Sequence, residues 1–159
     1  MAFLTRPKVA DRSPWENVTS IQSTALVAQL TTSATNAATS ATQVAGLTAT
    51  TTQVNSKTQY FEVFLSGDSV SNSGSNNVVI TLWVGTVGTG TQVGSFSATA
   101  QSGALVPLAA TFFVPVSATS ALVPGSSYVL NIGMHGSGAG TNTMTAGATS
   151  PVTMVVQAI

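Results

Sequence analysis

The sequence predicts a mainly β protein, built as an antiparallel β-sandwich. Short stretches of alternating apolar and polar residues recur along the chain, and this alternation is the period of a half-buried strand. Gly, Ser and Asn separate the stretches, and seven or so strands at this spacing are typical of a sandwich. Only 5% of the residues are charged whereas 43% are hydrophobic, so Thr and Ser hydroxyls must replace charges on the outer faces.

Three segments differ in composition, namely residues 1–19, 20–52 and 53–159. The first segment holds apolar side chains, two prolines and most of the charge. Pro7 and Pro14 favour an extended backbone before them, and disordered tails seldom carry Phe, Leu and Trp. We therefore expect an extended docking arm, with a frayed terminus as the alternative. Its anchors would be Phe3, Leu4, Arg6, Lys8, Arg12 and Trp15.

The second segment, 20–52, is rich in Ala and Thr, and its apolar residues repeat at spacings of three and four. This heptad spacing predicts a helix over residues 20–45 that ends at Gly46 and contributes to a trimer. Thr lowers helix propensity because its branched β carbon restricts the side chain, so an extended linker or a strand is the alternative. The trimer seam would be Val27, Leu30, Ala34, Ala37, Ala41 and Val44.

The third segment, 53–159, predicts the strands of the sandwich. The first strand, 59–65, is expected to end at a turn over residues 66–68. In a later strand, Phe112 and Phe113 should face opposite sides, because successive side chains alternate. The other strands are expected at 77–84, 93–99, 109–116, 127–134, 141–146 and 152–157.

The distribution of charge excludes most chemistry. From Ser69 to Ile159 no side chain is charged. Acid–base catalysis needs a titratable group placed by a partner, and one His without Cys cannot form a zinc site. We therefore expect no enzyme, no cofactor and no metal, with His135 exposed in a Gly-rich loop. Four basic residues balance four acidic ones, which leaves no basic patch for nucleic acid.

The sequence offers a possible calcium site but no membrane-spanning segment. Asp68, Asn72, Asn76 and Asn77 could offer oxygens to calcium, but their spacing is not that of an EF-hand and turn-forming Asx chemistry explains them more simply. No apolar run approaches the ~18 residues of a membrane span. The N-terminus lacks the apolar core of a secretory signal, so we expect synthesis in the cytoplasm and no membrane partner.

The arrangement of arm, Ala/Thr segment and charge-free sandwich resembles virion proteins of tailed bacteriophages, in particular capsid decoration (cement) proteins and head or tail fibres. The stretches 124–130 and 150–156 are similar to the last strands of trimeric jelly-roll heads of the tumour-necrosis-factor-like kind. Pro124-Gly125 followed by Tyr128 also resembles the tyrosine corner of immunoglobulin-like sandwiches. Jelly roll and immunoglobulin-like topologies therefore both stay open.

The resemblance implies a non-enzymatic structural protein on the capsid surface of a virion. Its partners would be the major capsid protein, held by the arm, and further copies of itself in a homotrimer. The alternative is a receptor-binding fibre or adhesin, in which the Gly-rich loops and Trp83 or Tyr60 would contact a host glycan.

Overall fold

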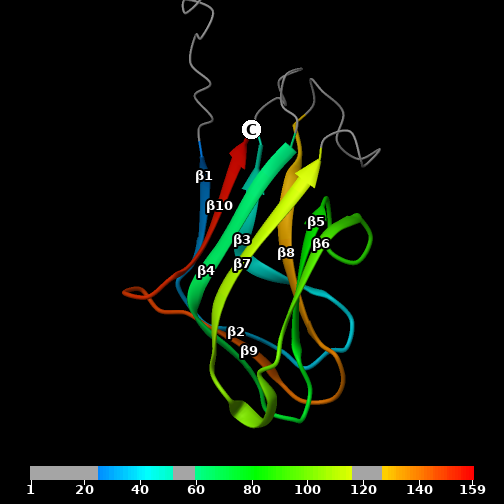
Figure 1. The fold of residues 1–159 in the computed structure, drawn as a ribbon, viewed down its shortest axis with the longest axis vertical. Coiled ribbons are helices and arrows are strands. Elements are labelled where there is room, and N and C mark those ends of the chain that lie inside the picture. The colour runs from blue at the N-terminus through cyan, green and yellow to red at the C-terminus, as the bar shows by residue number, and fades with distance from the viewer. Residues whose placement is uncertain (1–24, 52–59, 116–126) are drawn as a thin grey trace, which may run out of the picture.

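The computed structural model describes residues 25–51, 60–115 and 127–159, and arranges ten strands of this part of the chain in two packed sheets (Figure 1). The six-stranded sheet contains β1 (Leu26–Leu30), β2 (Ala34–Asn36), β4 (Tyr60–Asn72), β7 (Val106–Pro115), β9 (Asn142–Thr145) and β10 (Val152–Ala158). The four-stranded sheet contains β3 (Thr42–Thr50), β5 (Val78–Val84), β6 (Thr91–Ala98) and β8 (Val129–Gly136). The predicted antiparallel β-sandwich is confirmed.

The order of pairing makes the sandwich a jelly roll. Apart from the short β2 and β9, the strands pair from the two ends of the chain inward. β1 pairs with β10, β3 with β8, β4 with β7, and β5 with β6. These four pairs form one long antiparallel hairpin that folds over into two sheets. The folding places β10 beside β4 in one sheet and β8 beside β5 in the other. Nested antiparallel strands in two sheets define the jelly roll, so the immunoglobulin-like alternative is set aside.

The hydrophobic core lies between the two sheets and takes every second side chain of the long strands. Along β7 the exposed fraction is 5% for Phe112 but 60% for Phe113, so the predicted opposite orientations are confirmed. Each large side chain buried in this way contributes roughly 1.5–3 kcal/mol. The largest buried side chains include Leu47, Leu65, Ile80, Leu82, Leu108, Leu130, Ile132, Met134, Met144 and Met154.

The strand β4 runs through the six-stranded sheet from end to end. Its first half pairs with β10 and its second half with β9, while β7 lies along its other side. The turn predicted at residues 66–68 is therefore wrong. Gly67 is there because a Cβ at this position would lie 2.6 Å from the Val152 side chain, and the register with β7 shifts between Gly67 and Val70. The glycine marks a close approach and a bulge within the strand.

The helix predicted over residues 20–45 is also wrong for its described part, because residues 25–51 form β1, β2 and β3. Burial there follows a period near two, with Ala28 and Leu30 in the core, and Gly46 lies inside β3 where its register with β8 shifts. Branched Thr suits a strand better than a helix, and this preference outweighed the heptad spacing. No helix in the described ranges is long and apolar enough to cross a membrane.

The residues of the predicted trimer seam consequently share no single face. Leu30 and Val44 are buried in the sandwich core, whereas Val27 and Ala37 are exposed. Ala34 and Ala41 are half-buried. The sandwich therefore begins at β1 rather than at residue 53, and the arm predicted over 1–19 lies outside the described residues.

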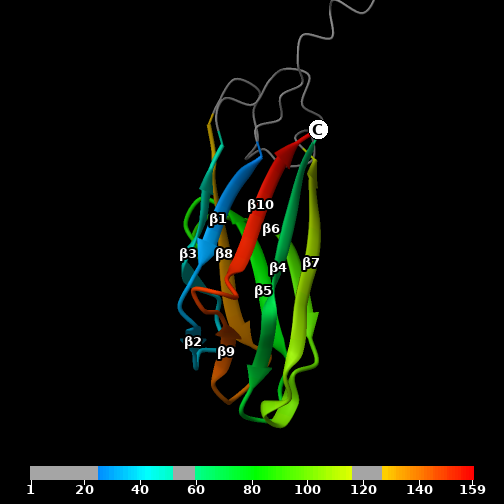
Figure 2. The ribbon, with the colours of Figure 1, turned by 90° about the vertical axis from the view of Figure 1, so that its left-hand side faces the viewer.

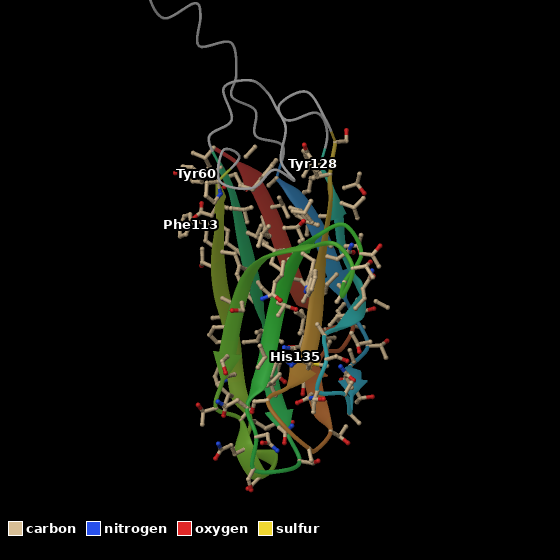
Figure 3. All side chains as sticks on the ribbon, turned by 90° about the vertical axis from the view of Figure 1, so that its right-hand side faces the viewer. Tyr60, Phe113, Tyr128 and His135 are labelled. Atoms are coloured by element: carbon tan, nitrogen blue, oxygen red, sulfur yellow. The ribbon has the colours of Figure 1, made fainter. Side chains whose placement is uncertain are left out.

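The strands predicted after residue 53 are otherwise present, with ends that differ by a few residues. His135 is a further correction, because it belongs to β8 and is half-buried rather than exposed in a loop. Its Nδ1 lies 3.0 Å from the carbonyl oxygen of Gly136 (labelled in Figure 3).

Candidate docking surface

The described part of the chain begins beside one end of the sandwich, which we call the arm end. There β1 starts, β10 ends, β4 starts and β7 ends, as Figure 1 shows. Backbone hydrogen bonds between Tyr60 and Ile159, of 3.1 and 2.9 Å, complete the ladder between β4 and β10 at this end. In the other sheet the Thr51 amide donates to the Tyr128 carbonyl oxygen at 2.7 Å. The anchors predicted in the arm, Phe3, Leu4, Arg6, Lys8, Arg12 and Trp15, lie outside the described residues.

Next to the arm end, the outer face of the six-stranded sheet carries a cross-strand row of apolar side chains. Figure 2 shows β1, β10, β4 and β7 side by side across this face. Val27 pairs with Val155, and Val155 with Phe64, so the three side chains lie in one row across three strands. The exposed fractions of Val27 and Phe64 are 59% and 39%, and Val155 is half-buried. Outward-facing apolar side chains in register form a contiguous patch.

An aromatic pair extends this patch toward the arm end. The rings of Tyr60 and Phe113 meet edge to face, with centroids 6.0 Å apart and an interplanar angle of 65° (Figure 3). Tyr60 lies on the same face of β4 as Phe64, and Phe113 projects from the adjacent strand β7. We call the set Val27, Tyr60, Phe64, Phe113 and Val155 the apolar face.

Two carboxylates, both on β4, are the charged side chains of the described ranges. Glu62 is half-buried beside Phe113, its cross-strand partner, and Asp68 is exposed further along the strand. The ranges 25–51, 60–115 and 127–159 contain neither Lys nor Arg, so neither carboxylate has a basic partner there. Glu62 therefore lies between Phe113 of the apolar face and Gln157, its partner on β10, with no basic side chain of the described ranges to pair with it.

The opposite end of the sandwich, which we call the amide end, is built differently. Asn72 and Asn142 are fully buried, and the Asn72 Nδ2 donates to the Asn142 Oδ1 at 2.7 Å. The Asn142 Nδ2 donates in turn to the Asn36 carbonyl oxygen at 2.8 Å, and the Asn36 Nδ2 to the Met134 carbonyl oxygen at 2.6 Å. The chain of amides joins β4, β9, β2 and β8, and buried amides satisfied in this way fix one geometry.

The Gly-rich loops at the amide end close over these amides. The Asn72 Oδ1 accepts a hydrogen bond from the Gly74 amide at 2.7 Å, which is the Asx turn predicted as the simpler explanation of this asparagine. Gly140 has a φ of +119°, and a Cβ there would lie 2.5 Å from the Asn72 Oδ1. The described residues contain no group of three or more His, Cys, Asp or Glu able to hold a metal ion. The buried Asn72 side chain thus holds the loop after β4 by a hydrogen bond to its backbone.

The outer face of the four-stranded sheet carries Trp83, which the glycan-binding alternative singled out. Its indole Nε1 donates to the Thr81 Oγ1 at 2.8 Å, and the side chain is half-buried. Asn131, its cross-strand neighbour, accepts hydrogen bonds from Gln43 and Thr48 at 3.0 and 2.7 Å and donates to the Gly85 carbonyl oxygen at 2.8 Å. Most of the hydrogen-bonding capacity beside Trp83 is therefore already used within the sheet.

Sequence reasoning did not find the apolar face. The alternation in residues 59–65 contained the signal, because it places Tyr60, Glu62 and Phe64 on one side of a strand. The pairing of this strand with β10, and of β10 with β1, which brings Val155 and Val27 alongside, has no signal in the sequence.

No protein-family model matches this sequence, and no curated protein does. Among solved structures, the chain is similar to one titled PRD1 vertex protein P5, with 14% identity and a TM-score of 0.44 over 85% of this chain and 96% of that chain. It is also similar to a chain of the structure titled infectious bursal disease virus Gx strain, with 18% identity and a TM-score of 0.35. That second similarity covers 85% of this chain and 37% of the other. At these TM-scores neither similarity assigns a function.

Proposed function

We propose that this protein is a non-enzymatic structural protein of a virus particle, which binds and stabilises a phage capsid shell as a decoration protein. Its N-terminal arm holds the shell, and the major capsid protein is its partner. Phe3, Leu4 and Trp15 bury apolar area in grooves of the shell, while Arg6, Lys8 and Arg12 pair with carboxylates there. Aromatic and Arg side chains are the usual anchors of protein interfaces.

The observation that carries this proposal is the contrast between the two ends of the sandwich. Outward-facing apolar side chains and the start of the described chain lie together near the arm end. The amide end presents mostly polar loops fixed by buried asparagines, and Leu105 is the large apolar side chain exposed there. A molecule built in this way is suited to attach by the arm end and to expose the amide end to solvent.

The test is binding to shells of the parent virus prepared without this protein. We expect that deletion of residues 1–19 abolishes co-sedimentation with the shells while the sandwich keeps the circular dichroism spectrum of its strands and still unfolds cooperatively. A full-length chain with Leu105→Ser, which changes a 69% exposed side chain immediately before β7, is the matched control and should bind as the wild type does. Unchanged affinity of the truncated protein would show that the arm does not hold the shell.

We propose in addition that the protein assembles as a homotrimer on the particle. The heptad seam no longer supports this, because its residues lie on strands. The support that stays is the nearly uncharged outer surface, which can pack against copies of itself at little desolvation cost. Sedimentation equilibrium of the full chain should give the mass of a trimer, and a monomer at micromolar concentration contradicts it.

The second candidate is a receptor-binding protein that recognises a host glycan, and the half-buried Trp83 is the observation in its favour. An aromatic face can stack on a sugar without any charge nearby. A glycan array probed with the full chain tests it, with Trp83→Ala to locate the site and Tyr128→Ala as the aromatic control. Binding that Trp83→Ala abolishes and Tyr128→Ala preserves supports this function, whereas an array without hits excludes the sugars it carries.

A further inference from the structure

The apolar face has the properties of a contact site for another segment or protein. Val27, Phe64 and Phe113 are 59%, 39% and 60% exposed, and they lie on neighbouring strands of one sheet. Scattered exposed apolar residues are normal on a protein surface, but a contiguous patch in register marks a contact site. Its occupant must offer apolar side chains to Phe64 and Phe113 and a positive charge to Glu62.

The first 24 residues of this chain have both properties. They include Phe3, Leu4 and Trp15, and they hold three of the four basic residues of the protein, Arg6, Lys8 and Arg12. Three basic side chains against Asp11 and Glu16 give this segment a net charge of +1, whereas Glu62 and Asp68 give the described sandwich −2. Opposite charge and shared apolar character make the two surfaces complementary.

The covalent connection brings the two surfaces together. The segment joins the sandwich at Ala25, immediately before β1, and Val27 on that strand is already part of the apolar face. From β1 to β7 is three strand spacings, roughly 14 Å. Ala25 is ten residues further along the chain than Trp15, and an extended chain over ten such steps reaches roughly 33 Å. Trp15 and Arg12 can therefore reach any part of the face, and the tether keeps them at an effective concentration in the millimolar range.

A second copy of the sandwich fits the apolar face less well than residues 1–24 do. Were the face to pack on the same face of a second copy, the contact would bring two Glu62 carboxylates, one from each copy, into one apolar interface. No Lys or Arg of the described ranges could compensate, and like charges at an interface oppose binding. The segment 1–24 brings the missing cations, and a second sandwich does not.

We propose that in the free protein residues 1–24 bind the outer face of β1, β10, β4 and β7, with Phe64 and Phe113 as the apolar contact and Glu62 as the ionic one. The consequence of this contact rests on the proposed function: an arm that binds a shell must first leave this face, so attachment exchanges one apolar contact for another. The contact itself belongs to the free protein and can be tested without particles.

Limited proteolysis with trypsin of the full-length chain tests the contact directly. Arg6 precedes a proline and resists cleavage, so the cleavable bonds follow Lys8, Arg12 and Lys57. The rate of cleavage after Arg12, relative to that after Lys57 in the same sample, measures how often the arm leaves the face. We expect the double variant Phe64→Ser/Phe113→Ser to raise this ratio about tenfold, which corresponds to about 1.4 kcal/mol of lost binding. Glu62→Gln should raise it severalfold.

Matched controls separate this contact from general loosening of the fold. Leu105→Ser removes an equally exposed apolar side chain away from the face, and Asp68→Asn removes the other carboxylate. Leu105→Ser should leave the ratio unchanged, and Asp68→Asn should change it less than Glu62→Gln does. Circular dichroism of each variant verifies that the sandwich is folded.

Two results would overturn the proposal. The first is equal cleavage after Arg12 in the wild type and in folded Phe64→Ser/Phe113→Ser. The second is that this variant turns a wild-type oligomer into a monomer in sedimentation while cleavage after Arg12 stays the same, because the face is then covered by another copy. Neither result bears on attachment to shells, since deletion of residues 1–19 tests that separately.

Discussion

The two ends of this jelly roll satisfy their side chains in opposite ways. At the amide end, polar side chains are taken out of water and paired with one another, from Asn72 through Asn142 to Asn36. Near the arm end, apolar side chains such as Phe64 on β4 and Phe113 on β7 are left facing outward. The same strands, β4 among them, contribute to both ends.

The contrast indicates that the amide end contributes to the stability of the fold and that the apolar face contributes to binding. A buried amide that loses its partner raises the free energy of the folded state directly, because the orphaned group has no water. An exposed aromatic side chain contributes little to folding and is free to contribute to an interface. Substitutions at the amide end should therefore change the free energy of unfolding, and substitutions on the apolar face should change contacts with other segments or proteins.

The largest effect is expected where β7 separates core from surface. Phe112→Ala should reduce the free energy of unfolding by about 3–5 kcal/mol because it opens a cavity between the sheets. Phe113→Ala, the adjacent residue on the outer face, should reduce it by only about 1 kcal/mol, which is the contribution of its ring contact with Tyr60. Urea unfolding of the two variants measures both values, and equal losses would mean that the apolar face is part of the folded core.

At the amide end, Asn142→Leu should cost about 3 kcal/mol, because it leaves the Asn72 Nδ2 and the Asn36 carbonyl oxygen without partners. Ser75→Ala, at an exposed position of the neighbouring loop, is the control and should be neutral. Amide hydrogen exchange of residues 72–77 should accelerate in Asn142→Leu alone. A loss of stability below about 1 kcal/mol would mean that the amides are not a structural unit.

Gly140→Ala should cost about 2 kcal/mol, since its φ of +119° disfavours any side chain and the new Cβ would lie 2.5 Å from the Asn72 Oδ1. Gly147→Ala is the matched control, because nothing lies within 4 Å of its added Cβ. Thermal melts of the pair should separate by several degrees. Coincident melts would show that the loop over Asn72 adjusts freely.

The smallest effect concerns the aromatic pair on the apolar face. A double-mutant cycle with Tyr60→Leu and Phe113→Leu should give a coupling of about 1 kcal/mol for the edge-to-face contact of the two rings. The cycle is measured by urea unfolding with residues 1–24 present. Coupling near zero would indicate that the two rings turn independently toward solvent.

The spacing of apolar residues in the sequence predicts a strand correctly where apolar and polar residues alternate clearly, and fails where the contrast between them is small. Phe112 and Phe113 were assigned to opposite faces correctly because the strand imposes a period of two. Residues 20–45 were misread because Ala and Thr carry little hydrophobic contrast, so a spacing of three and four between Val27 and Val44 imitated a heptad. Glycine was misread in the same way: Gly67 looked like a turn, although it makes room for Val152 inside a strand.

The sequence by itself determined the fold class, the positions of the strands after residue 53 and the concentration of charge in the N-terminal segment. These follow from neighbours along the chain, such as the alternation within β5 or the charge-free stretch from Ser69 to Ile159. Only the tertiary structure decided the jelly-roll order, the joining of Asn36, Asn72 and Asn142, and the row from Val27 through Val155 to Phe64. Each of these depends on which distant strands pair, and the pairing of strands far apart in the sequence is set by the packing of the whole core rather than by any local pattern.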